Sequence, residues 1–188
     1  MEADWEVEIA PSAPVIEAIW AGFLDLRRFP GRISEIEETR SFPALAQALR
    51  QLNRSISSVD SQVWTSKCDV WVLEQLDPAE MDALLEESTV GLACYIDLLP
   101  RDVEIFKNFD RVEKWARSVV SQLRPVSRQC CRADLVIRHA IMSQHEGLGI
   151  TAYVSACGAG ADSAQSSLNG ALGALVETVA ATSFASNL

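Results

Sequence analysis

Residues 133–181 read ADLVIRHAIMSQHEGLGITAYVSACGAGADSAQSSLNGALGALVETVAA, and this stretch contains two strand-like runs, a glycine-rich bend and a long helical pattern. In Leu148–Ala156, apolar residues alternate with small or polar ones, which is the period of a half-buried strand. Ala133–Met142 alternates in the same way, and the short polar segment Ser143–Gly147 predicts an antiparallel hairpin. Beyond Gly158–Gly160, apolar residues recur at spacings of three and four. This pattern predicts a helix that packs across one face of the hairpin.

The preceding sequence adds further elements. Asp4–Ala10 alternates acidic with apolar residues, which predicts a strand with one acidic face, suited to a protected edge or a solvated face. Val63–Leu73 is rich in β-branched and aromatic residues, Val90–Leu99 alternates, and both are predicted strands. Predicted helices cover Val15–Arg28, a segment that restarts at Ser41–Pro43, a segment that begins at Asp77, and most of Val103–Leu123.

Four or five strands that alternate irregularly with helices, with a hairpin among them, indicate an α+β fold. We expect a mainly antiparallel sheet with its helices packed on one face, and a ferredoxin-like sandwich is the nearest common architecture. An N-terminal helical segment is added to it. No repeat or obvious linker divides the chain, so residues 1–188 are expected to form a single domain. Within it, residues 11–60 are a candidate helical subdomain and residues 61–188 the α+β core.

Composition and charge restrict the class of protein. With 188 residues, of which 48% are hydrophobic, the chain can bury a substantial core. Its formal charge of −10 argues against nucleic acid as a partner, because phosphate backbones are bound by clustered Lys and Arg. No apolar run approaches membrane-spanning length, so we expect no membrane partner. The N-terminal MEADWEVEIA is acidic where a signal peptide is basic, and we therefore expect a cytoplasmic location.

Residues suited to catalysis or metal binding are few. The five cysteines show no CxxC spacing and are expected to be reduced and mostly buried. His139 falls on the inward phase of its strand, where it is expected to be partly buried, and His145 falls in the hairpin loop. Two such histidines do not make a metal site or a triad, and no G-x-S-x-G elbow occurs. We therefore predict no catalytic residues, no metal ligands and no cofactor.

The glycine-rich bend is the most suggestive local motif. A strand, a glycine bend and a helix start can direct backbone N–H groups at an anion. The bend nevertheless lacks the Lys of a phosphate-binding loop and the third Gly of a dinucleotide fingerprint. Asp162 or Ser163 is expected to cap the helix. Gly158 and Gly160 are predicted either to serve the backbone geometry of the joint or to bind an anion or small ligand.

The outward phase of the predicted sheet gathers aromatic and charged residues: Tyr95, Asp97, Asp134, Arg138, Thr151, Tyr153 and Ser155. If this face is uncovered, it is suited to binding. Alternatively, the N-terminal helices cover it, or its side chains are ordinary solvent-facing residues. Tyr95, Asp97, Arg138 and Tyr153 are our predicted binding residues on this face. Tyr95, Arg138 and Tyr153 are expected to contribute to binding and not to folding.

The sequence thus favours a non-catalytic binding or protein-interaction module of an acidic cytoplasmic protein, with a protein partner or ligand on an aromatic and Arg-bearing sheet face. The alternative is a small-ligand or anion-binding sensor, or an enzyme, that uses the Gly158–Gly160 bend. Small residues of the last helix, such as Gly170 and Gly173, permit close approach of another backbone, within the chain or in a homodimer.

Overall fold

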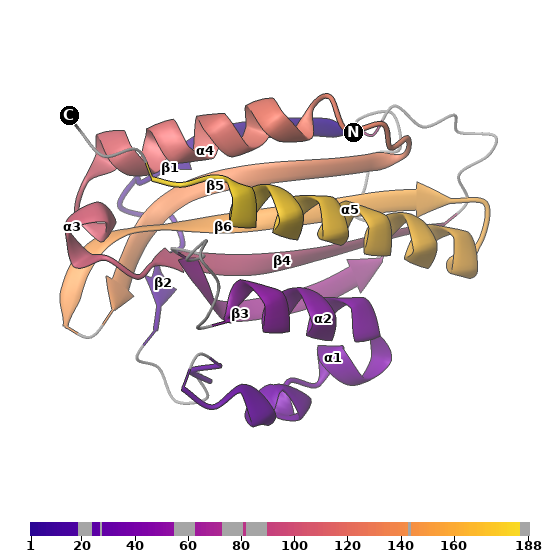
Figure 1. Ribbon diagram of the computed structural model, residues 1–188, viewed down its shortest axis with the longest axis horizontal. Helices are drawn as coiled ribbons and strands as arrows, with labels where there is room; N and C mark the ends of the chain where they lie inside the picture. Colours follow the sequence, from indigo (N-terminus) through magenta and orange to yellow (C-terminus); the bar gives the residue numbers. More distant parts are fainter. Residues whose placement is uncertain are drawn as a thin grey trace.

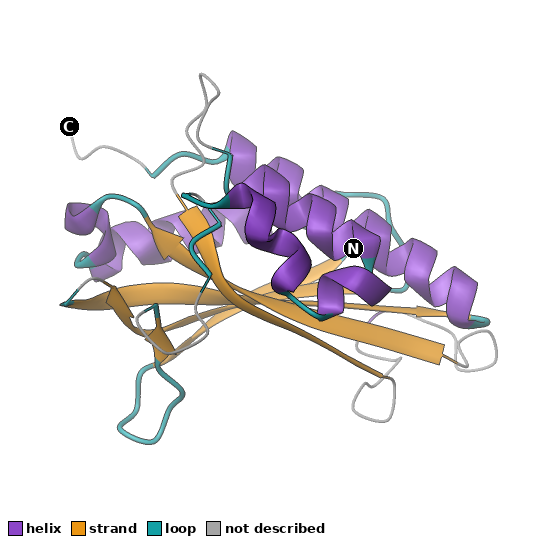
Figure 2. Cartoon of the chain, turned by 90° about the horizontal axis from the view of Figure 1, so that it is seen from below, coloured by secondary structure: helices purple, strands orange, loops and turns teal. Residues whose placement is uncertain are grey.

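Helices pack against one face of an open sheet, in two layers (Figures 1 and 2). The computed structural model describes residues 1–18, 24–26, 28–54, 63–72, 81, 90–142 and 144–184, and for 63–72 only the backbone is described. The strands are β1 (Glu2–Glu8), β2 (Ile16–Glu17), β3 (Val63–Val72), β4 (Val90–Pro100), β5 (Cys131–Met142) and β6 (His145–Gly158). The helices are the 3-10 helix η1 (Pro30–Glu35), α1 (Glu38–Ser41), α2 (Pro43–Leu52), α3 (Val103–Phe106), α4 (Phe109–Leu123) and α5 (Ala161–Ala181).

The sheet is mixed. Its strand order is β1-β5-β6-β4-β3, and β2 also pairs with β5. The pairs β3–β4, β4–β6 and β5–β6 are antiparallel, whereas β1 and β2 run parallel to β5. The α+β class is therefore confirmed, but the sheet is not antiparallel throughout. Alternation along β1 shows that one face is apolar, and it does not reveal the direction in which the strand pairs.

The core lies between the sheet and the helices α2, α4 and α5. Alternate residues of the central strands, such as Ile96, Leu135 and Ile150, are fully buried against these helices. Trp115 of α4 donates its indole N–H to the carbonyl of Thr182 (3.0 Å), and its ring stacks on Phe184. These contacts fix the C-terminal end of α5 beside α4. Buried side chains of α2 belong to the same cluster, and whether residues 11–60 form a separate subdomain stays a prediction.

The hairpin of β5 and β6 is longer than predicted. Met142 pairs with His145, so β6 already begins at His145. Gln144 has a φ of 70°, a left-handed conformation that is common in tight hairpin turns. The predicted bend Ser143–Gly147 was therefore too long at its C-terminal side.

The predicted helix Val15–Arg28 is wrong at its start. Ile16 and Glu17 form β2 and pair with Ala140 and Ile141 of β5. The backbone N–H of Ala18 continues this contact, because it donates to the carbonyl of Ile141 (2.9 Å). Residues 24–26 and 28 are not helical either. Residues 19–23 and 27, and all of the predicted helix that begins at Asp77 except Met81, lie outside the described residues.

Near the C-terminal end of β5, the buried side chains no longer lie on the helical side of the sheet but on the opposite side. Ile137 is buried on the helical side, His139 is exposed, and Ala140 and Met142 are buried on the opposite side. The prediction of a partly buried His139 was therefore wrong. Ala140 and Met142 join a second, smaller apolar cluster with Ile16, Ala18, Leu99 and Phe106.

Glycine makes room for the second cluster. A Cβ atom at Gly147 would lie 2.4 Å from the ring of Phe106, which α3 brings over this end of the sheet. A Cβ atom at Gly149 would lie 2.8 Å from Cδ1 of Ile16.

No helix in the described ranges is both long and apolar enough to cross a membrane.

Candidate functional site

We call the side of the sheet opposite α2, α4 and α5 the outer face. In Figure 2 the helices lie together on one side of the strands. The helix α2 packs on α5 in this layer, and its buried residues belong to the core on the helical side of the sheet. The N-terminal helix α2 therefore does not cover the outer face, whereas residues 19–23 and 27 of the predicted helix Val15–Arg28 lie outside the described residues.

Three of the predicted binding residues meet at the centre of the outer face. Tyr95 of β4 lies opposite Tyr153 of β6, and their ring centroids are 5.9 Å apart. Tyr153 in turn pairs with Asp134 of β5. The neighbouring row contains Asp97 opposite Thr151. Parity along the strands was sufficient to predict this grouping, because register partners point to the same face.

Arg138 joins the same group through hydrogen bonds. Its Nε donates to Glu8 of β1 (2.9 Å), and its Nη1 donates to Thr151 Oγ1 (3.2 Å) and to Tyr153 Oη (3.0 Å). The guanidinium also lies 5.5 Å from the Tyr153 ring centroid. The Arg138 side chain is only 11% exposed, compared with 40% for Glu8. Arg138 thus connects three strands and is not presented to solvent as a free cation.

The electrostatics agree with this role. Burial alone would lower the pKa of Arg138, but the hydrogen bonds to Tyr153 and Glu8 outweigh burial and raise the pKa above its ordinary value. The guanidinium is therefore permanently charged and neutralised within the protein. We expected Arg138 to contribute to binding and not to folding, whereas these contacts indicate a large structural contribution.

Asp97 lies at the other end of this network. It is only 6% exposed, and Oδ1 accepts a hydrogen bond from Thr151 Oγ1 (2.7 Å). The Thr151 hydroxyl donates to Asp97 while it accepts from Arg138, so one hydroxyl links a carboxylate to a guanidinium. Such a chain fixes the orientation of Tyr153 and of the side chains around it.

A pocket of about 240 Å³ opens beside Tyr153. It is lined by residues of β1, β5 and β6: Asp4, Trp5, Glu6, Arg132, Asp134, Val136 and Tyr153. Arg132 forms an ion pair with Asp134, with 2.6 Å between Nε and Oδ2. At the sheet edge, Nη2 of Arg124 lies 3.4 Å from Oδ1 of Asp4. The sequence did indicate an acidic face on β1. It gave no sign that this strand lies next to β5, and Asp4, Glu6 and Glu8 were therefore missed as site residues.

The glycine-rich bend is distant along β6 from this pocket. A Cβ atom at Gly158 would lie 2.4 Å from the backbone nitrogen of Ala164, because the start of α5 packs directly on the strand end. Gly160 is the N-cap of α5, and Asp162 lies in the first turn, so the predicted cap at Asp162 or Ser163 was wrong. Close packing accounts for Gly158. A role of Gly158 and Gly160 in ligand binding stays a prediction.

The described residues contain no group of three or more His, Cys, Asp or Glu side chains placed to hold a metal ion. Comparisons of the chain with protein-family models, with curated proteins and with solved structures give no match.

Proposed function

We propose that the chain is a non-catalytic protein-interaction module that binds a cationic segment of a partner on the outer face of its sheet. The observation that carries this proposal is the pocket beside Tyr153, whose lining combines an aromatic ring with the carboxylates of Asp4, Glu6 and Asp134. Carboxylates provide charge complementarity, and an aromatic face attracts Lys and Arg side chains.

The balance of charge on the outer face supports a cationic partner. Its two described guanidiniums are each paired with a carboxylate of the same face, Arg132 with Asp134 and Arg138 with Glu8. Glu6 has no ion-pair partner among the described residues and is exposed. Asp4 contacts Arg124 at the sheet edge (3.4 Å), so the negative charge left for a partner is carried chiefly by Glu6. The net charge of −10 favours rapid encounter with a basic segment.

The size of the pocket favours a side chain of a partner protein. Its volume of about 240 Å³ is below the roughly 300–1,000 Å³ of pockets that enclose drug-sized ligands. A single Lys or Arg side chain inserted beside Tyr153 fits this size better than a cofactor does. Tyr and Arg are also the residue types most often found at the centres of protein interfaces.

The finer features of fold and location form part of the same proposal. The strands β4 and β5 run in the same direction with β6 between them, and α4 and α5 lie on one face, as in the split βαβ unit of ferredoxin-like folds. We therefore propose a ferredoxin-like core, with β1 added at the β5 edge.

A cytoplasmic location is supported by the free thiols of Cys94, Cys130, Cys131 and Cys157.

A fluorescein-labelled decapeptide of alternating lysine and serine tests the proposed function by fluorescence anisotropy. We expect saturable binding to the wild type. The variant Asp4→Asn/Glu6→Gln/Asp134→Asn should bind at least about tenfold more weakly, which corresponds to 1.4 kcal/mol. The amides keep the size of the side chains and remove their charge.

The matched control is Glu37→Gln/Glu146→Gln/Glu177→Gln, which removes the same charge from exposed positions elsewhere. We expect its affinity for the peptide to stay within about twofold of wild type, since only local charge should matter. Equal weakening in both variants would mean that the peptide senses net charge alone, and the proposed function would then be wrong.

A further inference from the structure

A second pocket lies on the helical side of the molecule, where the proposed binding face does not reach. It has a volume of about 280 Å³ and lies between η1 and the C-terminal end of α2. Its lining residues are Leu26, Pro30, Ile33, Leu49, Arg50, Asn53 and Arg54. Leu26, Ile33 and Leu49 are almost completely buried, whereas Arg50 and Arg54 are exposed. The pocket therefore has an apolar floor and a basic rim.

We propose that this pocket binds a small amphipathic anion, namely a monocarboxylate with a short hydrocarbon body. The apolar floor removes the hydrocarbon from water, and the guanidiniums bind the carboxylate. Arg is well suited to this task because its planar group donates two parallel hydrogen bonds to a carboxylate. Apolar walls with a few convergent polar groups are typical of small-molecule sites.

The two guanidiniums are available for a ligand. Neither Arg50 nor Arg54 forms an ion pair with a carboxylate of the described residues, whereas the nearby Arg32 is paired with Glu35 (2.8 Å). The segment from 24 to 54 holds six arginines against four carboxylates, a net charge of +2 in a chain whose net charge is −10. The local positive charge of this region therefore favours the binding of an anion.

The end of α2 is held in place beneath the two arginines. Asn53 donates its side-chain N–H to the carbonyl of Leu49 (2.8 Å), which closes the last turn of the helix. Arg54 lies beyond the helix end, and its carbonyl accepts a hydrogen bond from Arg101 Nη2 (3.2 Å). The backbone that carries Arg54 is thus anchored from a second part of the chain, and its position relative to the pocket is fixed.

The volume restricts the ligand. About 280 Å³ is slightly below the range of pockets for drug-sized molecules, so a chain of about eight carbons fits better than a long-chain lipid. Basic residues at a helix C-terminus also stabilise the helix dipole. That effect accounts for a charge near the end of α2, but it does not account for an apolar pocket beneath it.

Isothermal titration with octanoate, kept below its critical micelle concentration, tests the proposal. We expect saturable binding with one site. The variant Arg50→Gln/Arg54→Gln should bind octanoate at least about tenfold more weakly, because charge-assisted hydrogen bonds to the carboxylate are lost. Both residues are exposed, so the variant should fold.

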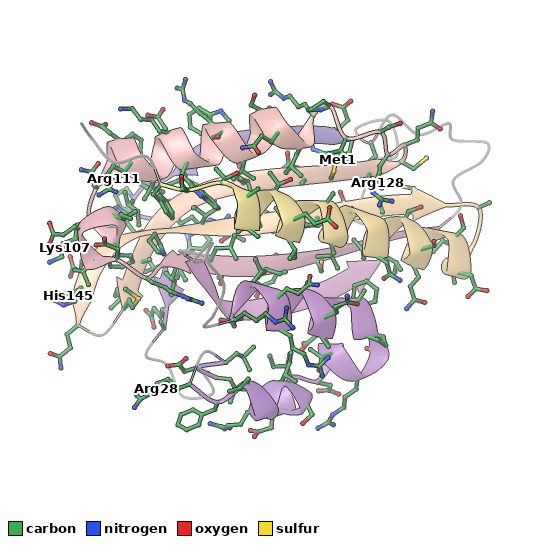
Figure 3. All side chains as sticks on the ribbon, viewed as in Figure 1. Met1, Arg28, Lys107, Arg111, Arg128 and His145 are labelled. Atoms are coloured by element: carbon green, nitrogen blue, oxygen red, sulfur yellow. The ribbon has the colours of Figure 1, made fainter. Side chains whose placement is uncertain are left out.

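The control Arg28→Gln/Arg40→Gln removes the same charge from the same segment, at positions that do not line the pocket. Figure 3 shows Arg28 at the outer edge of this segment. We expect this control and the outer-face variant Asp4→Asn/Glu6→Gln/Asp134→Asn to bind octanoate like the wild type. Octylamine, which has the same body and the opposite charge, should not bind.

Any of three results would overturn the proposal. Equal binding of octanoate and octylamine would mean that only the hydrocarbon is recognised. Unchanged octanoate affinity in Arg50→Gln/Arg54→Gln, or no binding to the wild type, would remove the arginines from the site. None of these results bears on the binding of the basic peptide to the outer face, because the two sites share no residue.

Discussion

At the scale of single residues, Arg138 joins three strands through one guanidinium. We predict that Arg138→Met lowers the free energy of unfolding by roughly 1–3 kcal/mol, because Glu8, Thr151 and Tyr153 each lose a donor on a half-buried surface. Urea denaturation followed by tryptophan fluorescence measures this change.

Arg32→Met provides the comparison for Arg138. Arg32 and Glu35 form an ion pair whose side chains are 48% and 51% exposed. Exposed pairs of this kind contribute little to stability, because solvent screens the attraction between the two charges. If both variants lose the same small amount of stability, the network around Arg138 is dispensable for folding, and Arg138 returns to the role of a binding residue.

The same residues show what the sequence could and could not tell at this scale. Parity placed Arg138 on one face with Tyr95 and Tyr153, since side chains alternate along a strand. The partner of Arg138, however, is Glu8, which lies 130 residues away along the chain. No local pattern connects residues at such a separation, and Arg138 was therefore predicted to contribute to binding and not to folding.

At the scale of elements, the joint between β6 and α5 depends on one glycine. We predict that Gly158→Ala costs roughly 1–3 kcal/mol of stability, as overpacking does in a well-packed interior. The new Cβ would lie 2.4 Å from the backbone nitrogen of Ala164, so α5 must shift to admit it. Thermal and urea unfolding of the variant give the magnitude.

Gly160→Ala is the matched control two residues further along. No atom lies within 4 Å of a Cβ built at Gly160, and its φ of −173° is extended backbone that any residue adopts. The expected loss is below about 1 kcal/mol, since Ala is only a poorer N-cap than Gly. A loss at Gly160 as large as at Gly158 would contradict close packing as the reason for the glycine.

Elements with a long, regular pattern were predicted well. The alternating strands β1, β4, β5 and β6 and the periodic helices α2, α4 and α5 were all identified within a few residues. β2 was missed because it contains only two residues and is defined by its pairing with β5. Its apolar residue Ile16 also fits the helical arc of the following sequence, and short apolar runs of this kind do not distinguish the two states.

At the scale of the whole molecule, stability should depend on two buried thiols at high pH. Burial, with a smaller contribution from nearby Cys130, raises the pKa of Cys131 and of Cys157 from 9.0 to about 11. In the unfolded chain both thiols ionise near pH 9, while the folded protein keeps them protonated up to about pH 11. The free energy of unfolding is therefore fully retained below pH 9 and falls as the pH rises from 9 to 11.

Urea midpoints measured across this pH range test the prediction. The variant Cys131→Ala/Cys157→Ala should show a shallower decline than the wild type, because the difference in proton binding between its folded and unfolded states is smaller. Lys and Tyr residues also titrate at high pH, but they do so in both proteins. Identical slopes in the two proteins would show that the two thiols ionise as easily in the folded protein as in the unfolded chain.

The pairing of β1 with β5 has a consequence for biosynthesis. β1 is translated long before β5, and in the described sheet β5 is the only strand with which it pairs. During elongation on the ribosome, Glu2–Glu8 must therefore wait until residues 131–142 have emerged. Its alternating carboxylates repel the equivalent strand of neighbouring nascent chains in a polysome, as charged side chains do on exposed sheet edges. The acidic strand is thus suited to remain unpaired until its own partner has been made.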